Sequence, residues 1–310
     1  MHITVAICTW NRADLLEKTL DHLTNVIVPD GVCWELLVVN NKCTDHTDTI
    51  IERFYDKLPL KRIFEPKQGL SNARNAALTA AQGEYILWTD DDVLVDSQWI
   101  IAYLDAFKRW PDAAVFGGKV LPWFEVSPPN WLEQHLDRLG RYFALRDFGD
   151  EELILPAGQN PYGANMAFRA KVFNDYQFNP DLGRKGNLLV SGEDAEVISN
   201  IRKQGGTVVW IPKSKVQHFL PQDRMTLSYL RKLHYSNGYY EIGAIQNPKR
   251  CIAGYPFWFL RQRIKSELLY RWGRIYKPES YFWLDQMMRA SSLAGQLAAT
   301  KIALQTKKSS

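Results

Sequence analysis

The first hundred residues alternate between short apolar runs and segments with helical periodicity, and this alternation constrains the fold more than any other feature. Apolar runs of strand length cover residues 3–9, 34–39, 60–64 and 84–89. Helical spacing covers residues 13–26, 45–58 and 71–82, and we expect Asp45 to cap the second helix and Gly83 to end the third. This alternation predicts an α/β fold, in which a parallel sheet has helices on both faces.

The rest of the chain continues this domain and then becomes helical. A helix over 97–110 and a strand over 113–120 precede residues 121–161, which we expect to be irregular with short helices. A strand over 162–169, a helix over 193–204 and a strand over 207–211 follow, and His218 lies beyond that strand. Three final helices are expected over 225–244, 256–275 and 280–304.

Three consecutive aspartates, Asp90, Asp91 and Asp92, follow the fourth apolar run. Ligands of open sheets bind beyond the carboxyl ends of the strands, where residues 9–12 and 40–41 also lie. Adjacent carboxylates raise one another's pKa unless a cation lies among them. Carboxylate oxygens suit Mg²⁺ or Mn²⁺, so this edge predicts a metal site shared with substrate phosphates. The alternative is a solvated acidic turn that caps the next helix.

Charge is distributed unevenly along the chain. Residues 201–310 hold 19 Lys and Arg against 5 Asp and Glu, a balance of +14, which leaves −10 for the first 200 residues. Sixteen Phe, Trp and Tyr residues lie in the basic segment, and this mixture suits an anionic membrane surface. The alternative is that these aromatic residues pack against the catalytic domain or form a homodimer interface.

Two further features bear on the compartment. No apolar stretch approaches the about 20 residues of a membrane-spanning helix, and no signal peptide is visible, so we expect a cytoplasmic protein, free or peripheral on the inner face of the cell membrane. Four cysteines lack metal-binding spacing and are expected to be free thiols: Cys8, Cys33, Cys43 and Cys251.

Five motifs occur in a recognisable order: Thr-Trp-Asn-Arg (9–12), Val-Val-Asn-Asn-Lys-Cys-Thr-Asp (38–45), Gly-Leu-Ser-Asn-Ala-Arg-Asn (69–75), Asp-Asp-Asp (90–92) and Ser-Gly-Glu-Asp (191–194). With them the chain resembles a bacterial family-two glycosyltransferase of the GT-A fold. The resemblance implies a nucleotide-sugar-binding sandwich with a mixed, mostly parallel sheet. It implies a catalytic domain over 1–220, whose parts 1–95 and 96–220 serve the nucleotide and the acceptor, followed by a basic, aromatic-rich helical extension over 221–310.

The resemblance also implies an activity. An inverting, metal-dependent enzyme would move a sugar from a nucleoside-diphosphate sugar to a glycan or lipid-linked acceptor in cell-surface polysaccharide synthesis. The nucleotide side would comprise Thr9, Asn11, Arg12, Asn40, Arg74, Asp90 and Asp91. Asp90, Asp92 and His218 would hold Mn²⁺ or Mg²⁺, although a lone histidine is more often structural.

One departure concerns the base. Many relatives carry an aspartate where this chain has Asn40, and that aspartate accepts a hydrogen bond from uracil. An amide both donates and accepts, so a UDP-sugar remains the favoured donor while guanosine and thymidine nucleotides stay open.

On the acceptor side, the resemblance makes Asp194 the general base, with Glu193 beside it. The alternative for both is a role in stabilising a helix N-terminus. Residues 179–186 resemble a flexible acceptor-side loop. Asn165 would lie on the sugar-side strand, and Trp123 would stack on a sugar or pack in the core.

Three other readings stay open from the sequence. A nucleotidyltransferase would carry a glycine-rich loop after the first strand, and residues 9–14 contain no glycine. A nucleic-acid-binding protein would use the basic tail, but no reading motif is present, so we expect no nucleic-acid partner. A catalytically silent scaffold would not need the retained Asp90, Asp92 and Asp194.

Overall fold

The computed structural model describes residues 1–183, 192–240, 251–252 and 255–306. The chain forms two compact units, one built from 1–123 and 144–219 and the other from 124–143 and 220–310. The C-terminal unit therefore includes residues 124–143, which the sequence had grouped with the catalytic domain.

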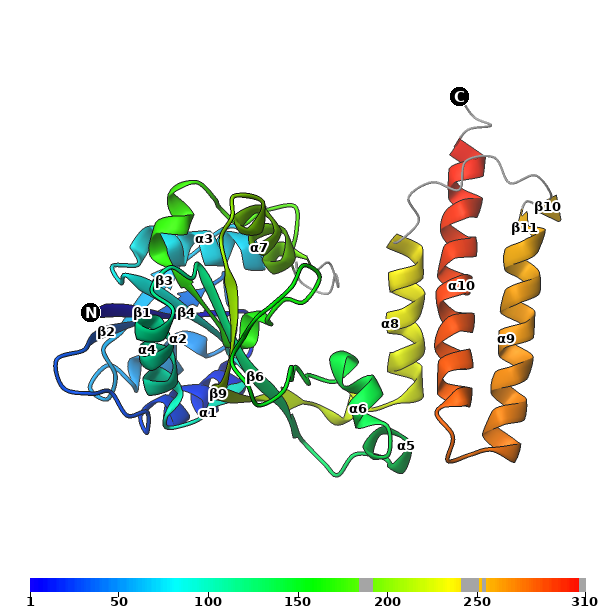
Figure 1. Cartoon of the computed structure of the whole chain (residues 1–310), viewed down its shortest axis with the longest axis horizontal. Coiled ribbons are helices and arrows are strands. Elements are labelled where there is room, and N and C mark those ends of the chain that lie inside the picture. The colour runs from blue at the N-terminus through cyan, green and yellow to red at the C-terminus, as the bar shows by residue number, and fades with distance from the viewer. Residues whose placement is uncertain (184–191, 241–250, 253–254, 307–310) are drawn as a thin grey trace. The chain divides into compact units, whose positions relative to one another are not determined.

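The first unit is an α/β sandwich of the expected class (Figure 1). Its strands are β1 (His2–Thr9), β2 (Cys33–Asn40), β3 (Leu60–Phe64), β4 (Tyr85–Asp90), β5 (Val93–Val95), β6 (Val115–Phe124), β7 (Leu153–Ile154), β8 (Met166–Arg169) and β9 (Val208–Leu220). The strand order is β3-β2-β1-β4-β8-β6-β9-β5, with β7 also pairing with β9. The sheet is mixed: β1 to β4 pair in parallel, whereas β8 pairs antiparallel with β4 and β6, and β5 and β7 pair antiparallel with β9.

Helices cover both faces of this sheet. They are α1 (Ala13–Leu23), α2 (Thr47–Glu52), α3 (Leu70–Ala80), α4 (Trp99–Arg109) and α7 (Glu193–Lys203). Alternate residues of β1 enter different cores: Val5 and Ile7 pack with α1, α2 and α4, while Ala6 packs with α3 and α7. Because side chains alternate along a strand, each apolar run can fill two cores at once.

Several element boundaries differ from the predictions. Strand β5 was missed, and β9 continues to Leu220 because it pairs with β5, so His218 lies within the strand and not beyond it. The predicted strand over 162–169 begins with a 3₁₀ turn, Gly163–Asn165, and becomes β8 only at Met166.

Two predicted helix signals act differently in the structure. Helix α2 begins at Thr47, and Asp45 Oδ1 accepts a hydrogen bond from the Thr47 N–H at 3.2 Å while Oδ2 accepts one from Ala13 N–H at 3.0 Å. Asp45 thus supports the first turns of both α1 and α2. Gly83 does not end α3, which stops at Ala80. A Cβ on Gly83 would lie 2.4 Å from the backbone nitrogen of Thr4, so glycine allows the chain to approach β1 there.

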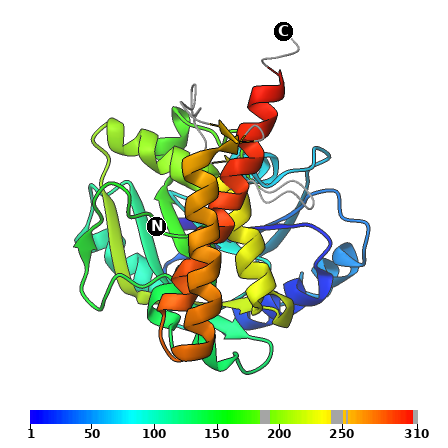
Figure 2. The same cartoon turned by 90° about the vertical axis from the view of Figure 1, so that its right-hand side faces the viewer.

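The second unit consists mainly of helices. They are α5 (Asn130–Glu133), α6 (Leu136–Leu139), α8 (Leu227–Tyr240), α9 (Phe257–Tyr276) and α10 (Phe282–Thr306), with a short hairpin of β10 (Cys251–Ile252) and β11 (Tyr255–Pro256). Helix α10 lies between α8 and α9 (Figure 1), and α9 and α10 run side by side in Figure 2. Their core contains Leu230, Tyr270, Trp283 and Met287. The three predicted helices are confirmed, except that 241–244 lie outside the described residues.

Among the described residues, no helix has the length and apolar composition needed to cross a membrane. The thiols of Cys8, Cys33 and Cys43 are free, as predicted, and the side chain of Cys251 lies outside the described part of the chain.

Candidate active site

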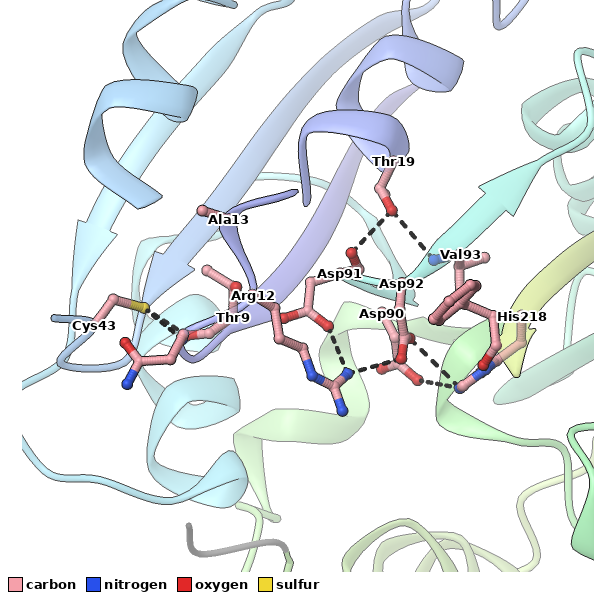
Figure 3. A network of polar contacts seen from close by, with 12 residues as sticks. Thr9, Arg12, Ala13, Thr19, Cys43, Asp90, Asp91, Asp92, Val93 and His218 are labelled. Atoms are coloured by element: carbon pink, nitrogen blue, oxygen red, sulfur yellow. Dashed lines mark hydrogen bonds and ion pairs between the residues drawn. The ribbon is translucent and has the colours of Figure 1, made fainter. Parts of the chain in front are cut away.

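The acidic turn after β4 is held from two sides (Figure 3). The Thr19 hydroxyl of α1 donates to the carbonyl of Asp91 at 3.0 Å and accepts a hydrogen bond from Val93 N–H at 3.2 Å. From β9, Phe219 N–H donates to the carbonyl of Asp92 at 2.9 Å. These bonds fix the backbone of the turn and therefore the positions from which its carboxylates project.

Arg12, at the start of α1, points into this turn (Figure 3). Its Nη1 lies 2.7 Å from Asp92 Oδ2 and 3.1 Å from Asp91 Oδ1. Burial opposes the charge of Arg12, but the two carboxylates outweigh burial and raise its pKa. Burial also raises the pKa of Asp91 to about 6, although Arg12 works against that rise. Arg12 therefore positions the acids, and its contact with a nucleotide stays a prediction.

Asp90, Asp92 and His218 form the one three-residue group among the described residues whose ligand atoms lie within 4.8 Å of one another. His218 Nε2 lies 3.5 Å from Asp92 Oδ1 and 3.8 Å from Asp90 Oδ2. His218 Nδ1 lies 3.0 Å from the carbonyl oxygen of Phe219, which can only accept, so Nδ1 carries a hydrogen and Nε2 is the nitrogen that faces the two carboxylates. Two carboxylates repel one another, and together with an imidazole nitrogen they form a ligand set that fits a divalent metal.

A second charged cluster joins α3 to the start of α7. Arg74 is only 2% exposed, its Nη1 is ion-paired with Asp194 Oδ1, and Glu193 Oε1 lies 3.7 Å away. The guanidinium lies over the rings of Trp88 and Phe178, 5.6 Å and 5.1 Å from their centroids. Such stacking suits a planar cation and fixes its orientation.

Asp194 has a perturbed acidity. The pKa of Asp194 is raised to about 6: burial is the largest cause, Glu193 and Asp90 add to the rise, and Arg74 opposes it. Asp90 of the first cluster is thus among the charges that act on Asp194. Arg74 was predicted to lie on the nucleotide side; here its guanidinium is directed at Asp194, and the nucleotide contact stays a prediction.

The residues at the end of β2 use their amides within the protein. Asn40 Nδ2 donates to Asp48 Oδ1 at 2.6 Å, and its Oδ1 accepts from Cys43 N–H at 2.7 Å. Asn41 Oδ1 accepts from Gly69 N–H at 2.8 Å. Both asparagines thus hold the loops that follow β2 and β3, and this arrangement disfavours base recognition through the buried Asn40 side chain.

Thr9 and Asn11 follow the same edge at the end of β1. The Thr9 carbonyl accepts a hydrogen bond from Asn41 N–H at 3.0 Å. Asn11 has a φ of 52°, and its Oδ1 accepts from Thr44 N–H at 2.7 Å. The predicted nucleotide-side residues therefore come together at one edge, although their roles toward a nucleotide remain predictions.

Residues 4–177 match the family model described as glycosyl transferase family 2. The chain belongs to this family. Its motifs at 9–12, 38–45, 69–75 and 90–92 all fall within the matched range. Family membership favours glycosyl transfer over the nucleotidyltransferase and nucleic-acid-binding alternatives, and the chain is a family-two glycosyltransferase.

Relatives of this glycosyltransferase extend over most of its length. The chain is 25% identical over 247 residues to the succinoglycan biosynthesis protein ExoM of Rhizobium meliloti, which covers 77% of this chain and 73% of ExoM. It is 26% identical over 252 residues to the glucosyl-dolichyl phosphate glucuronosyltransferase of Haloferax volcanii, covering 77% and 76% of the two chains.

A solved structure supports the fold. The mannosyltransferase PcManGT from Pyrobaculum calidifontis, determined with GDP-Man and Mn²⁺, superposes with a TM-score of 0.60 at 18% identity, covering 95% of this chain and 86% of that one. This glycosyltransferase therefore has the GT-A fold that the motifs implied.

The predicted sugar-side residues have different surroundings. Asn165 is 0% exposed; its Oδ1 accepts hydrogen bonds from Trp99 Nε1 at 2.8 Å and Tyr103 OH at 2.7 Å, and its Nδ2 donates to the Lys119 carbonyl at 2.9 Å. A sugar contact through this side chain is disfavoured, because its polar atoms are engaged in the core. Trp123 is half-buried and packs edge-on against Phe219. This position is compatible both with stacking on a sugar and with packing in the core.

Sequence reasoning missed the residues that support the site. Thr19, Trp88 and Phe178 lie in ordinary amphipathic or apolar contexts and carry no local signal. Gly163 is also in this group, because a Cβ there would lie 2.3 Å from Arg74 Nη2 and 2.7 Å from Asp194 Oδ2. Only the fold brings these residues to the charged groups.

Proposed function

We propose that this glycosyltransferase is an inverting, metal-dependent enzyme that transfers a sugar from a nucleoside-diphosphate sugar to a glycan or lipid-linked acceptor in cell-surface polysaccharide synthesis. One observation carries the proposal: the partly buried carboxylate of Asp194 has its pKa raised to about 6, chiefly by burial, and Asp90 of the Asp90, Asp92 and His218 group is among the charges that add to this rise. A proton acceptor and a cation site that act on one another electrostatically suit attack on an anomeric carbon beside a departing diphosphate.

The metal would be Mn²⁺ or Mg²⁺, held by Asp90, Asp92 and His218. Its chemistry there is to offset the negative charge of the diphosphate leaving group. Arg12 holds the opposite oxygen of Asp92 at 2.7 Å, so Asp92 Oδ1 stays directed at His218. Mn²⁺ accompanies the nucleotide sugar in PcManGT, which supports this assignment.

Asp194 would accept the proton of the acceptor hydroxyl. A pKa of about 6 leaves most of Asp194 deprotonated at neutral pH, yet keeps its basicity higher than that of an ordinary aspartate. Glu193 lies next to Asp194 and adds negative charge. Its Oε1 is 3.7 Å from Arg74 Nη1, which is longer than a hydrogen bond. We therefore assign deprotonation of the acceptor hydroxyl to the carboxylate of Asp194.

Substrates and location follow from the relatives and from composition. ExoM acts in succinoglycan biosynthesis, and the Haloferax volcanii relative is named for glucosyl-dolichyl phosphate, which supports a glycan or lipid-linked acceptor. A UDP-sugar is the donor we favour, with GDP-sugars as the alternative because PcManGT was solved with GDP-Man. We place the enzyme at the inner face of the cell membrane as a peripheral protein, with a homodimer as the alternative arrangement.

The test is a donor screen with purified full-length protein. UDP- and GDP-sugars are incubated with Mn²⁺, Mg²⁺ or EDTA, and nucleoside diphosphate release is measured. We expect slow hydrolysis of one donor class that requires the metal and is lost in Asp194→Asn. NMR of the product formed with an acceptor should show inverted anomeric configuration. Release of pyrophosphate, or equal rates in EDTA, would contradict the proposal.

A further inference from the structure

Helix α9 exposes an unusual amount of large apolar side chain. Half of the large hydrophobic residues that are exposed in the described chain lie on this one helix: Phe257, Trp258, Ile264, Leu268, Trp272, Ile275 and Tyr276. Leu268 is 63% exposed and Ile275 is 71% exposed. Single exposed apolar residues are ordinary on soluble proteins, whereas a cluster on one element marks an interaction surface.

These side chains share one face of α9. Phe257, Ile264, Leu268 and Ile275 recur at intervals of seven, four and seven residues, which places them in one stripe. The opposite side is accounted for, because Ser266, Tyr270 and Gly273 are buried and Tyr270 and Trp283 of α10 belong to one core. Among the described residues, helix α9 therefore packs through one face and exposes the other. We call the bare stripe, with Trp258, Trp272 and Tyr276 at its side, the α9 face.

Basic residues are interspersed within the α9 face. Arg261 and Lys265 are exposed and fall between the apolar positions, and exposed Arg271 borders them. The helix carries one acidic residue, Glu267, which is half-buried and lies 3.4 Å from both Arg231 and Arg271. The face is thus apolar, aromatic and cationic, and the one carboxylate of the helix is already paired with Arg231 and Arg271.

We infer that the α9 face docks on an anionic lipid bilayer, with the helix lying parallel to the membrane plane. The inference rests on the proposed peripheral location and names the surface that produces it. Apolar residues would enter the boundary between headgroups and acyl chains, the Trp and Tyr rings would lie at headgroup level, and the cations would pair with lipid phosphates. Along 20 residues the helix would present about 30 Å of such surface.

A second copy of the chain fits this face less well. In a twofold interface the same patch meets itself, so Arg261, Lys265 and Arg271 would oppose the same cations of the other copy. Like charges brought together cost free energy, and among the described residues only Arg271 of these three cations has a carboxylate partner, Glu267. Anionic lipid supplies the missing negative charge, and we therefore commit to the bilayer.

The test uses full-length protein and sedimentation with large vesicles. One set contains phosphatidylcholine with phosphatidylglycerol, and the other contains phosphatidylcholine alone. We expect binding to the anionic vesicles, weaker binding to the neutral ones, and loss of binding as salt rises. Leu268→Glu with Ile275→Glu should abolish binding. The matched control is Ile154→Glu, since Ile154 is 56% exposed on β7 and its replacement should leave binding unchanged.

Charge is tested separately. Arg261→Gln, Lys265→Gln and Arg271→Gln together should weaken binding to anionic vesicles by about a hundredfold. Lys61→Gln, Lys108→Gln and Lys171→Gln remove three exposed cations of the first unit and should have little effect. Circular dichroism of each variant should match the parent, because all these side chains are exposed.

The outcomes separate this inference from the proposed function. Absence of vesicle binding, or equal loss in the Ile154→Glu control, would overturn the inference. A dimer in light scattering that Leu268→Glu with Ile275→Glu converts to a monomer would assign the face to a second copy instead. Donor hydrolysis in solution is measured on the same preparations; if hydrolysis fails while vesicle binding persists, the proposed function fails and the α9 face stands.

Discussion

The guanidinium of Arg74 is ion-paired with the carboxylate of Asp194, although 120 positions separate the two residues in the sequence. Arg74 is held by the rings of Trp88 and Phe178, so its charge can move little. Asp194 therefore has a fixed orientation and a fixed counter-charge. This pair gives the proposed base its position and limits the rise of its pKa that burial causes, and it leads to several predictions.

Asp194→Asn should keep donor binding but reduce turnover by about a hundredfold or more, because the amide preserves size and removes basicity. Steady-state kinetics and calorimetry with the nucleoside diphosphate measure the two quantities. A variant with near-parental turnover would show that another group takes the proton.

The pH dependence of turnover should report the same group. Burial raises the pKa of Asp194 to about 6, and the base acts only when deprotonated, so kcat should be level above about pH 7 and fall as pH drops through 6. In Asp194→Asn this acid limb should disappear. A parental profile that stays flat from pH 7 to pH 5 would contradict the assignment.

Arg74→Met should lower the free energy of unfolding by about 3–5 kcal/mol, because it leaves buried carboxylates without their cation. It should also move the acid limb of the pH profile to higher pH, since Arg74 is the group that lowers the pKa of Asp194. Thermal unfolding and kcat against pH provide the readouts. Loss of stability without a shifted limb would reduce Arg74 to a packing role.

Gly163→Ala should disturb the pair directly. The new Cβ would lie 2.3 Å from Arg74 Nη2 and 2.7 Å from Asp194 Oδ2, so the groups must separate and turnover should fall. Gly158→Ala is the control, because a Cβ there meets no neighbouring atom although φ is 89°. Turnover of Gly163→Ala equal to that of the control would mean that the pair adapts without functional cost.

Asp92→Ala should remove the metal-dependent part of nucleotide affinity, because it takes one carboxylate from the group with Asp90 and His218. Calorimetry of UDP and GDP with and without Mn²⁺ measures this. Asp105→Ala, an exposed acid on α4, is the control. Unchanged metal-dependent affinity in Asp92→Ala would falsify the metal assignment.

Asn165→Ala distinguishes a structural role from a sugar contact. It leaves the buried donors of Trp99 and Tyr103 without their acceptor, so unfolding free energy should fall by about 3 kcal/mol or more. The KM for the donor should stay near the parental value. Asn25→Ala, at an exposed position, should change neither quantity. A large KM effect with unchanged stability would restore the sugar-side interpretation.

Much of the nucleotide half could be predicted from the sequence because its signals are local. Each apolar run of β1, β2 and β4 fills two cores with alternate side chains, and a short apolar run of this kind is visible in consecutive residues. The aspartates at the end of β4 follow from that reading, since a buried strand that ends in carboxylates delivers them to a sheet edge. The basic and aromatic character of residues 257–276 was likewise visible from composition.

Tertiary structure decided which of these residues meet. His218 reaches Asp92 only because β9 extends to pair with the unpredicted β5, and strand pairing depends on a partner far away in the chain. Asn165 is polar in sequence but lies in the core, because Trp99 and Tyr103 arrive from α4 to satisfy it. The sequence by itself therefore determined the fold class, the family and the acidic edge, whose causes are local. The partners of Arg74, Asn165 and His218 depended on packing between distant segments, which no local pattern contains.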